Sequence, residues 1–189
     1  IQIPVKNIVC LSSTHVALTD FLNANEIISG LGDTTYLFNP EVQKLAKAGK
    51  IIQVGKSQVL NNEQILALAP EVIMTSGSPN PNTNTYQPFI NAGINILPNS
   101  EWMENSLLGR AEWVKLMGAL INKDSLSEKK FEEIAYKYES VSTLAQNTKV
   151  KPKVISGKTF KGEWAIPGGN SYAANLLKDA GANYHGAKD

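Results

Sequence analysis

Short apolar runs alternate with stretches of helical periodicity along the first hundred residues. The runs predict strands, and polar N-capping residues followed by a Gly or Pro stop predict the helices between them. The predicted strands are 7–11, 26–29, 51–54, 71–75 and 94–97. Helices are expected to start near Ser12–Thr14, at Asn39, at Asn61 or Asn62, and at Tyr86. Continuous apolar strands alternating with helices predict a parallel sheet covered on both faces, an α/β/α sandwich over residues 1–121.

A different pattern follows. Residues 106–121 are amphipathic, and Asp124 or Ser125 caps a long helix over 125–146, which at 1.5 Å per residue is roughly 33 Å long. The tail then starts the strand–helix pattern again, with strands at 153–156 and 164–166 and a helix capped by Ser171. The sequence therefore predicts three parts: an N-terminal lobe (1–121), a long linking helix (122–149) and a tail (150–189).

The tail is too short to form an α/β lobe with its own core. We interpret it as the beginning of an incomplete C-terminal lobe. The alternative is that it packs onto the first lobe.

Charge and composition exclude several classes of protein. The net charge is +1, so nothing favours binding to nucleic acid or to an anionic membrane. Of the 18 basic residues only Arg110 is an arginine, so forked arginine clamps for phosphate or carboxylate are not available. The one cysteine, Cys10, can form neither an internal disulfide nor a thiolate metal cluster. The chain opens without a secretory signal, but a leader could have been removed, so the compartment stays open.

Ligands of open parallel sheets bind beyond the carboxyl ends of the strands. The loops expected there carry neutral polar groups and aromatic rings, which suit a bulky, partly apolar ligand held by hydrogen bonds and ring contacts. The candidate ligand-binding residues are Ser13, Thr14, His15, Asp33, Tyr36, Lys56, Ser76, Gly77, Trp102 and, from the tail, Trp164. The alternatives are that the aromatic side chains close the edge of their own domain, that His15 caps a helix, and that Asp33 and Lys56 are solvated.

Catalytic signatures are absent from the sequence. It has no GxSxG elbow and no phosphate-binding GxxxxGK[ST] loop, and Gly30-Leu-Gly32 lacks the third glycine of a dinucleotide fingerprint. The histidines, His15 and His185, lie far apart, which disfavours an imidazole-rich metal site. We therefore expect no catalytic residues, no bound metal and no cofactor.

The order of these segments resembles a known family. The residues NIVCLSST, IISGLGD, Asn39-Pro40, KIIQVGK, NNEQILALAPEVIMTSG, GINIL and SLLGRAEW, in this order, are similar to the class III substrate-binding proteins of ABC importers. The most specific part is Val54–Gly77, and the resemblance covers essentially the whole chain. Members of this family receive ferric siderophores, haem or vitamin B12.

The resemblance implies two α/β lobes joined by one long helix, with the ligand between the lobes. It implies that Glu63 meets a basic pocket on the membrane permease, and that Tyr36 lines the ligand cleft as an aromatic side chain does in vitamin B12 receptors. It also implies a periplasmic location or one at the outer face of the cytoplasmic membrane, with or without a lipid anchor. Arginines that grip anionic siderophores in some members have no counterpart here, which favours a neutral or weakly charged metal complex.

We thus expect a receptor without enzymatic activity, with an iron complex or a corrinoid as ligand and an ABC permease as partner. Two other classes remain open. One is a metabolic enzyme with a doubly wound domain and its active site at the strand ends. The other is an interaction module of a redox or chelatase complex, which would need more cysteines or a catalytic histidine.

Overall fold

The computed structural model describes residues 1–35, 37–56, 59–79 and 83–188. These residues form two compact units. Unit 1 comprises 1–100 and 114–128, and unit 2 comprises 101–113 and 129–189. The units follow contacts in space, whereas the three-part division of the chain at 121 and 149 remains a prediction.

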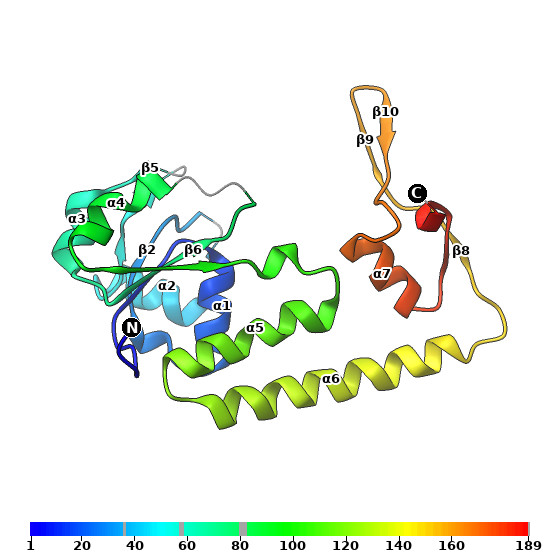
Figure 1. Ribbon diagram of the computed structural model, residues 1–189, viewed down its shortest axis with the longest axis horizontal. Helices are drawn as coiled ribbons and strands as arrows, with labels where there is room; N and C mark the ends of the chain where they lie inside the picture. The colour runs from blue at the N-terminus through cyan, green and yellow to red at the C-terminus, as the bar shows by residue number, and fades with distance from the viewer. Residues whose placement is uncertain (36, 57–58, 80–82, 189) are drawn as a thin grey trace. The chain divides into compact units, whose positions relative to one another are not determined.

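A five-stranded parallel sheet is the centre of unit 1 (Figure 1), with the strand order β3-β2-β1-β6-β7. Its strands are β1 (Ile8–Cys10), β2 (Ile28–Leu31), β3 (Ile52–Gln53), β6 (Val72–Ser76) and β7 (Asn95–Asn99). Cys10 and Leu31, the last residues of β1 and β2, pair with each other, and Cys10 also pairs with Met74, beyond which β6 continues for two more residues. The α/β fold with a parallel sheet that the sequence predicts is confirmed.

The helices of unit 1 begin where the polar capping residues stand. They are α1 (Ser13–Phe21), α2 (Pro40–Lys47), α3 (Asn62–Leu68) and α4 (Gln87–Asn91). Ser12, Asn39 and Asn61 each accept a hydrogen bond from a main-chain N–H of the first turn, which satisfies a donor that the helix itself leaves unpaired. α4 follows a short 3-10 helix, Thr83–Tyr86.

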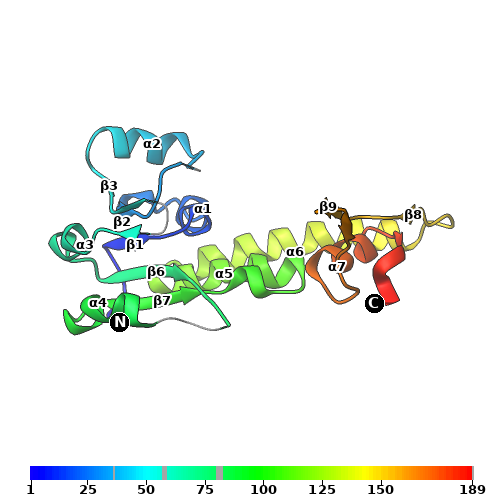
Figure 2. The same ribbon diagram turned by 90° about the horizontal axis from the view of Figure 1, so that it is seen from above.

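The core of unit 1 lies on both faces of the sheet. On one face, α3 and α4 cover the strands, whereas α1 lies on the other face (Figure 2). The first face contains a fully buried cluster of side chains, formed by Val9, Val54, Ile65, Ile73 and Phe89. Burying each of these large apolar side chains contributes about 1.5–3 kcal/mol, so this cluster is a main source of the unit's stability.

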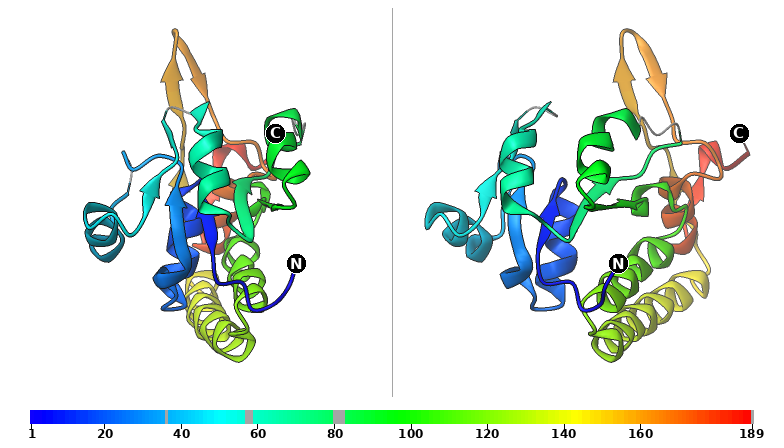
Figure 3. Two further views of the ribbon diagram at one scale, coloured as in Figure 1. Left: turned by 90° about the vertical axis from the view of Figure 1, so that its left-hand side faces the viewer. Right: turned by 60° about the vertical axis from the view of Figure 1, so that its left-hand side comes forward.

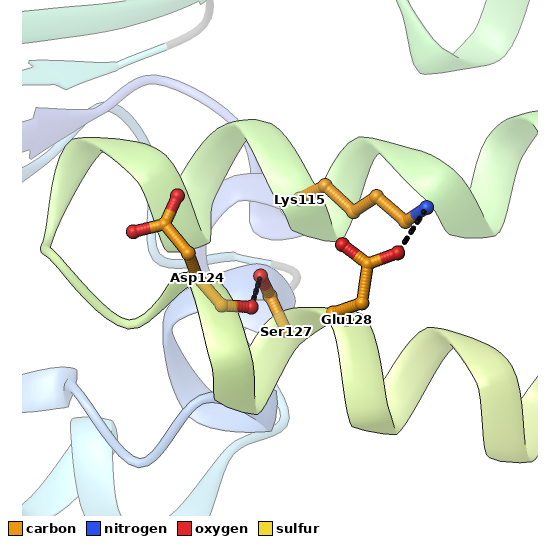
Figure 4. Close-up of polar contacts among 4 residues, drawn as sticks. All are labelled: Lys115, Asp124, Ser127 and Glu128. Carbon is orange, nitrogen blue, oxygen red and sulfur yellow. Dashed lines mark hydrogen bonds and ion pairs between the residues drawn. The ribbon is translucent and has the colours of Figure 1, made fainter.

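The end of α5 (Leu107–Leu120) packs closely against the start of α6 (Asp124–Gln146). A Cβ added at Gly118 would collide with the side chain of Ser127, which is itself buried and donates to the carbonyl of Asp124 at 2.8 Å. Lys115 of α5 pairs with Glu128 of α6 at 3.2 Å (Figure 4). The helix predicted over 125–146 is therefore continuous, and it starts one residue earlier.

Unit 2 contains α7 (Tyr172–Asp179) between two short parallel strands, β8 (Lys153–Val154) and β11 (Asn183–Tyr184). An antiparallel hairpin of β9 (Lys158–Phe160) and β10 (Glu163–Ala165) extends away from α7 (Figure 3). Side chains of α6 bind the C-terminal end of α7: Tyr138 donates to the carboxylate of Asp179 at 2.7 Å, and Ser142 donates to the carbonyl of the same residue at 3.1 Å. Gly181 follows the C-cap of α7 and has a positive φ, which favours glycine. A Cβ at this position would also collide with the carbonyl of Ala145 in α6.

Several predicted boundaries were wrong. The segment 26–29 is half 3-10 helix, because Asn25–Ile27 forms a turn and the strand starts at Ile28. The strand expected over 153–156 ends at Val154, and the one expected over 164–166 is Glu163–Ala165. The sequence did not predict the hairpin of β4 (Gly55–Lys56) and β5 (Val59–Leu60), nor β9 and β11. Strands of two or three residues are too short to give a periodic signal.

Candidate functional site

The carboxyl edge of the sheet in unit 1 collects several of the predicted ligand contacts. Because all five strands are parallel, the residues that follow β1, β2 and β6 lie at the same edge. Ser13 and Thr14 follow β1, Asp33 follows β2, and Ser76 and Gly77 end or follow β6. The hydroxyl, carboxylate and main-chain groups of these five residues form a polar rim. None of the five has a positively charged side chain.

The β1–α1 turn presents hydroxyl groups. Ser13 and Thr14 are exposed, and Thr14 Oγ1 shares a hydrogen bond of 2.7 Å with Ser12 Oγ. Ser12 Oγ also accepts from the main-chain N–H of Thr14 at 3.3 Å and so caps α1. The turn is thus ordered by its own side chains, while Ser13 remains available to a ligand at the helix start.

His15 lies inside the molecule rather than at the rim. Its side chain is 0% exposed, and neither ring nitrogen has a hydrogen-bond partner of normal geometry. Burial lowers the pKa of His15 from 6.5 to about 4, an effect that the nearby main chain of Met74 opposes. A neutral, buried imidazole offers no surface to a ligand, which disfavours the predicted role of His15 in ligand binding.

The β2–α2 loop carries an exposed carboxylate. Asp33 Oδ1 accepts from the main-chain N–H of Thr35 at 2.8 Å and from its hydroxyl at 2.6 Å. This local turn fixes the carboxylate near the end of β2 and leaves it at the surface. Tyr36, the next candidate in this loop, lies outside the described residues. Lys56 belongs to β4, where it pairs with Val59, and its side chain also lies outside what the structure describes.

The end of β6 is packed tightly against the end of β7. Gly77 is buried, and its N–H donates to the carbonyl of Asn99 at 2.7 Å. A Cβ at Gly77 would overlap the side chain of Ser100, so only glycine lets these two loops approach this closely. Ser76, one residue earlier, is exposed, whereas the buried hydroxyl of Thr75 shares a hydrogen bond of 2.6 Å with Tyr86.

An open pocket of about 620 Å³ lies beside this edge, between the β4–β5 hairpin and the start of α3. Amide side chains dominate its wall, with an exposed apolar residue and one carboxylate, that of Glu63. The lining residues are Gln53, Gly55, Val59, Leu60, Asn61, Asn62, Glu63 and Gln64. Glu63 is exposed in the first turn of α3, where the helix dipole favours a negative charge.

The two predicted tryptophan contacts belong to unit 2. Trp102 lies in a 3-10 helix, Glu101–Met103, and is 48% exposed. Trp164 lies in β10, is 58% exposed, and packs its indole against Gly157. Large aromatic side chains that stay this exposed are available for contact with a flat or bulky ligand.

Sequence reasoning missed the amide residues of the pocket and the surroundings of Arg110. Gln53, Asn61 and Asn62 line the pocket because the unpredicted β4–β5 hairpin stands opposite α3. Arg110 lies within α5, and its guanidinium stacks on the ring of Tyr172 in the tail, a contact that the sequence did not predict. The only signal for it in the sequence is that it is the sole arginine.

Among the described residues, no group of three or more His, Cys, Asp or Glu side chains could hold a metal ion. Cys10 is buried in β1, and burial raises the pKa of its thiol to about 12, so it stays protonated at neutral pH. No helix within the described parts of the chain has the length and apolarity that crossing a membrane requires.

Comparison with known proteins identifies the family. The sequence pattern of the periplasmic binding proteins matches residues 8–186. The chain therefore belongs to the periplasmic binding protein family, which confirms its resemblance to the class III receptors of ABC importers. Proteins of this family bind substrates for transport.

Individual relatives agree with this assignment. An uncharacterised lipoprotein of Methanocaldococcus jannaschii is 28% identical over 185 residues, which are 94% of this chain and 44% of the relative. The chain spans about half the length of the two curated relatives it matches, 44% and 57%.

Solved structures share the fold. A possible iron-binding (periplasmic solute-binding) protein of Staphylococcus epidermidis superposes with a TM-score of 0.77 at 15% identity, covering 98% of this chain and 69% of that protein. IsdE of S. aureus, complexed with heme, superposes with a TM-score of 0.67 at 18% identity, covering 94% of this chain and 64% of that protein.

Proposed function

We propose that the chain acts as the solute-binding receptor of an ABC importer, which captures an iron complex (siderophore or haem) or a corrinoid and delivers it to a membrane permease. The observation that carries this proposal is the polar, largely uncharged rim at the carboxyl edge of a periplasmic-binding fold. A receptor needs such a rim and no reacting groups. We further propose that the chain is not an enzyme.

Each unit carries proposed ligand contacts of its own. In unit 1 they are Ser13, Thr14, Asp33, Tyr36, Lys56, Ser76 and Gly77, and in unit 2 they are Trp102 and Trp164. Hydroxyl and main-chain groups can bind the oxygen atoms of a metal complex, and the exposed indoles can contact its apolar parts. Because Arg110 is the sole arginine and is already engaged, we expect a neutral or weakly charged complex.

Titration of tryptophan fluorescence tests the receptor function. Ferric siderophores, haemin and cyanocobalamin are added separately to the chain, and one of these ligands is expected to quench its emission at micromolar concentration. Trp102→Phe and Trp164→Phe should each remove part of the quenching. No quenching by any of the three ligands at high micromolar concentration would contradict the receptor proposal.

We propose Glu63 as the docking residue for the permease. Its carboxylate is exposed beside the pocket at the start of α3, where a basic group of the permease could reach it. Glu63→Ala should leave ligand affinity unchanged and slow delivery to permease reconstituted in vesicles. Glu26→Ala is the matched control, because Glu26 is also exposed but precedes β2 at the opposite edge of the sheet. Equal loss of delivery in both variants would remove Glu63 from this role.

We propose a location in the periplasm or at the outer face of the cytoplasmic membrane, with or without a lipid anchor. Family membership and the relative described as a lipoprotein support this location. Fractionation of cells that express the protein, with and without protease added from outside, tests it.

A further inference from the structure

The loop that carries Trp102 follows β7 in the sequence but belongs to unit 2. A loop after β7 would ordinarily be part of the rim of its own sheet. Side chains that bind the main-chain carbonyls of this loop explain its membership of unit 2. Arg110 donates from Nη2 to the carbonyl of Trp102 at 3.0 Å and from Nε to that of Glu104 at 3.3 Å. Asn175 of α7 donates to the carbonyl of Asn105 at 2.9 Å across 70 residues of sequence.

Arg110 also contacts α7 directly. Its guanidinium carbon lies 3.6 Å from the ring centroid of Tyr172, the first residue of α7. A planar guanidinium can stack on an aromatic face while its edge donates hydrogen bonds, which an ammonium group cannot do in the same way. One side chain thus joins the loop to α7.

The other side of the loop is fixed from α5. Trp113 donates from Nε1 to the carboxylate of Glu104 at 3.1 Å, and Ser106 accepts from the N–H of Gly109 at 3.0 Å. The main chain is therefore held at Trp102, Glu104 and Asn105, while the indole of Trp102 remains 48% exposed. A fixed main chain under an exposed ring lowers the entropy lost when the ring meets a ligand.

We propose that Arg110 is a positioning residue that holds Trp102 to α7 within unit 2. The value of this arrangement for ligand capture rests on the function proposed above, but the positioning itself does not. Arg110 fixes the carbonyl of Trp102, while 48% of this residue stays exposed, so the main chain beneath the proposed contact is set before a ligand arrives.

Fluorine NMR of the chain labelled with 5-fluorotryptophan tests the positioning without any ligand. The three tryptophans give three resonances, assigned with Trp102→Phe, Trp113→Phe and Trp164→Phe. Arg110→Ala should shift the Trp102 resonance towards that of the free amino acid and narrow it, while the Trp164 resonance stays in place. Arg110→Lys should do the same, because lysine keeps the charge but lacks the fork.

Two further variants serve as controls. Tyr172→Phe keeps the ring face and should leave the Trp102 resonance unchanged. Asn175→Ala should move it in the same direction as Arg110→Ala, but less. If Arg110→Ala unfolds unit 2, the native chemical shift of Trp164 is lost. Arg110→Lys and Asn175→Ala then test whether Arg110 positions Trp102. An unmoved Trp102 resonance in Arg110→Lys and Asn175→Ala would overturn the proposal, as would an unmoved one in folded Arg110→Ala.

This result is separate from the fluorescence titration of ligands. Failure of all three ligands to bind would remove the receptor function and leave the role of Arg110 to be decided by NMR.

Discussion

The two units are stabilised in different ways. Of the 24 buried apolar residues among those described, 22 belong to unit 1, and only Ala174 and Tyr184 belong to unit 2. Unit 2 also exposes large apolar side chains, among them Phe160 at 63% and Leu144 at 71%. Its helices are tied by side chains that bind main-chain carbonyls, as Ser142 and Gln146 of α6 bind the end of α7.

This difference shows that the groups that stabilise a unit need not be those that fix the positions of its helices. Buried apolar area supplies most of the free energy of folding, whereas an exposed hydrogen bond contributes about 1 kcal/mol or less. Unit 1 should therefore resist unfolding, while unit 2 holds defined positions with little stabilisation of its own. The predictions below test this contrast.

The largest effect is expected from a pair of identical substitutions. Phe89→Ala removes a fully buried ring from unit 1 and should lower the free energy of unfolding by about 3–5 kcal/mol. Phe160→Ala, in the exposed hairpin of unit 2, should change it by less than about 0.5 kcal/mol. Urea unfolding followed by circular dichroism measures both. Similar costs at the two sites would show that the contrast between the units is wrong.

Acidification should destabilise unit 1 through His15. Below pH 6.5 the unfolded chain binds a proton that the buried, neutral imidazole does not bind until the pH reaches about 4. Stability should therefore fall by about 1.4 kcal/mol per pH unit in this window, roughly 3 kcal/mol in total.

His15→Phe is the control for this pH dependence, because it keeps all the carboxylates that titrate in the same range. The difference in free energy of unfolding between the two proteins should be constant above pH 7 and should change as the pH falls from 6.5 to 4, because only the protein with His15 loses stability through this group. Parallel curves from pH 7 to pH 4 would mean that His15 takes up a proton in the folded protein as readily as in the unfolded chain.

A smaller loss is expected where α5 meets α6. A methyl group at Gly118 would collide with Ser127, so Gly118→Ala should cost about 1–3 kcal/mol despite alanine's better helix propensity. On the same helix but in unit 2, Gly109→Ala would meet only the ends of the Glu104 and Ser106 side chains, which can move. In thermal unfolding, Gly118→Ala should have a lower melting temperature than Gly109→Ala. The reverse order would contradict the tight packing of α5 against α6.

The smallest effect concerns Tyr138 in unit 2. Tyr138→Phe removes its hydrogen bond to Asp179 and should cost about 1 kcal/mol, seen as faster hydrogen exchange in α7. Burial, helped by Asp179, raises the pKa of Tyr138 from 10 to about 12. The unfolded chain therefore loses this proton first, and the contribution to stability declines as the pH rises from 10 to 12. Ultraviolet titration of the phenols should lose its last step in the variant.

The sequence predicted the fold where burial is continuous. The apolar runs around Val9 and Ile73 each became a buried strand of the parallel sheet, and Ser12, Asn39 and Ser171 capped helices as expected. Such features depend on neighbours along the chain, and a local pattern records them.

Features set by distant residues were not predictable in this way. The burial of His15 depends on the direction in which its side chain leaves the first turn of α1, and a periodic pattern does not distinguish a cap from a core position there. The membership of Trp102 in unit 2 depends on Asn175 and Tyr172, some seventy residues away. Of the candidate site, the polar rim in unit 1 and the place of Trp164 in the tail followed from the sequence, but the unit that carries Trp102 did not.

The engagement of Arg110 has one practical consequence. A protease that cleaves only after arginine has a single target in this sequence, inside α5. Cleavage requires the backbone around Arg110 to leave its helical conformation. The rate of cleavage therefore depends on the fraction of molecules in which this turn of α5 is unfolded. Cleavage at this one bond therefore measures local unfolding of α5 close to residues 113 and 114, where the helix passes from unit 2 to unit 1.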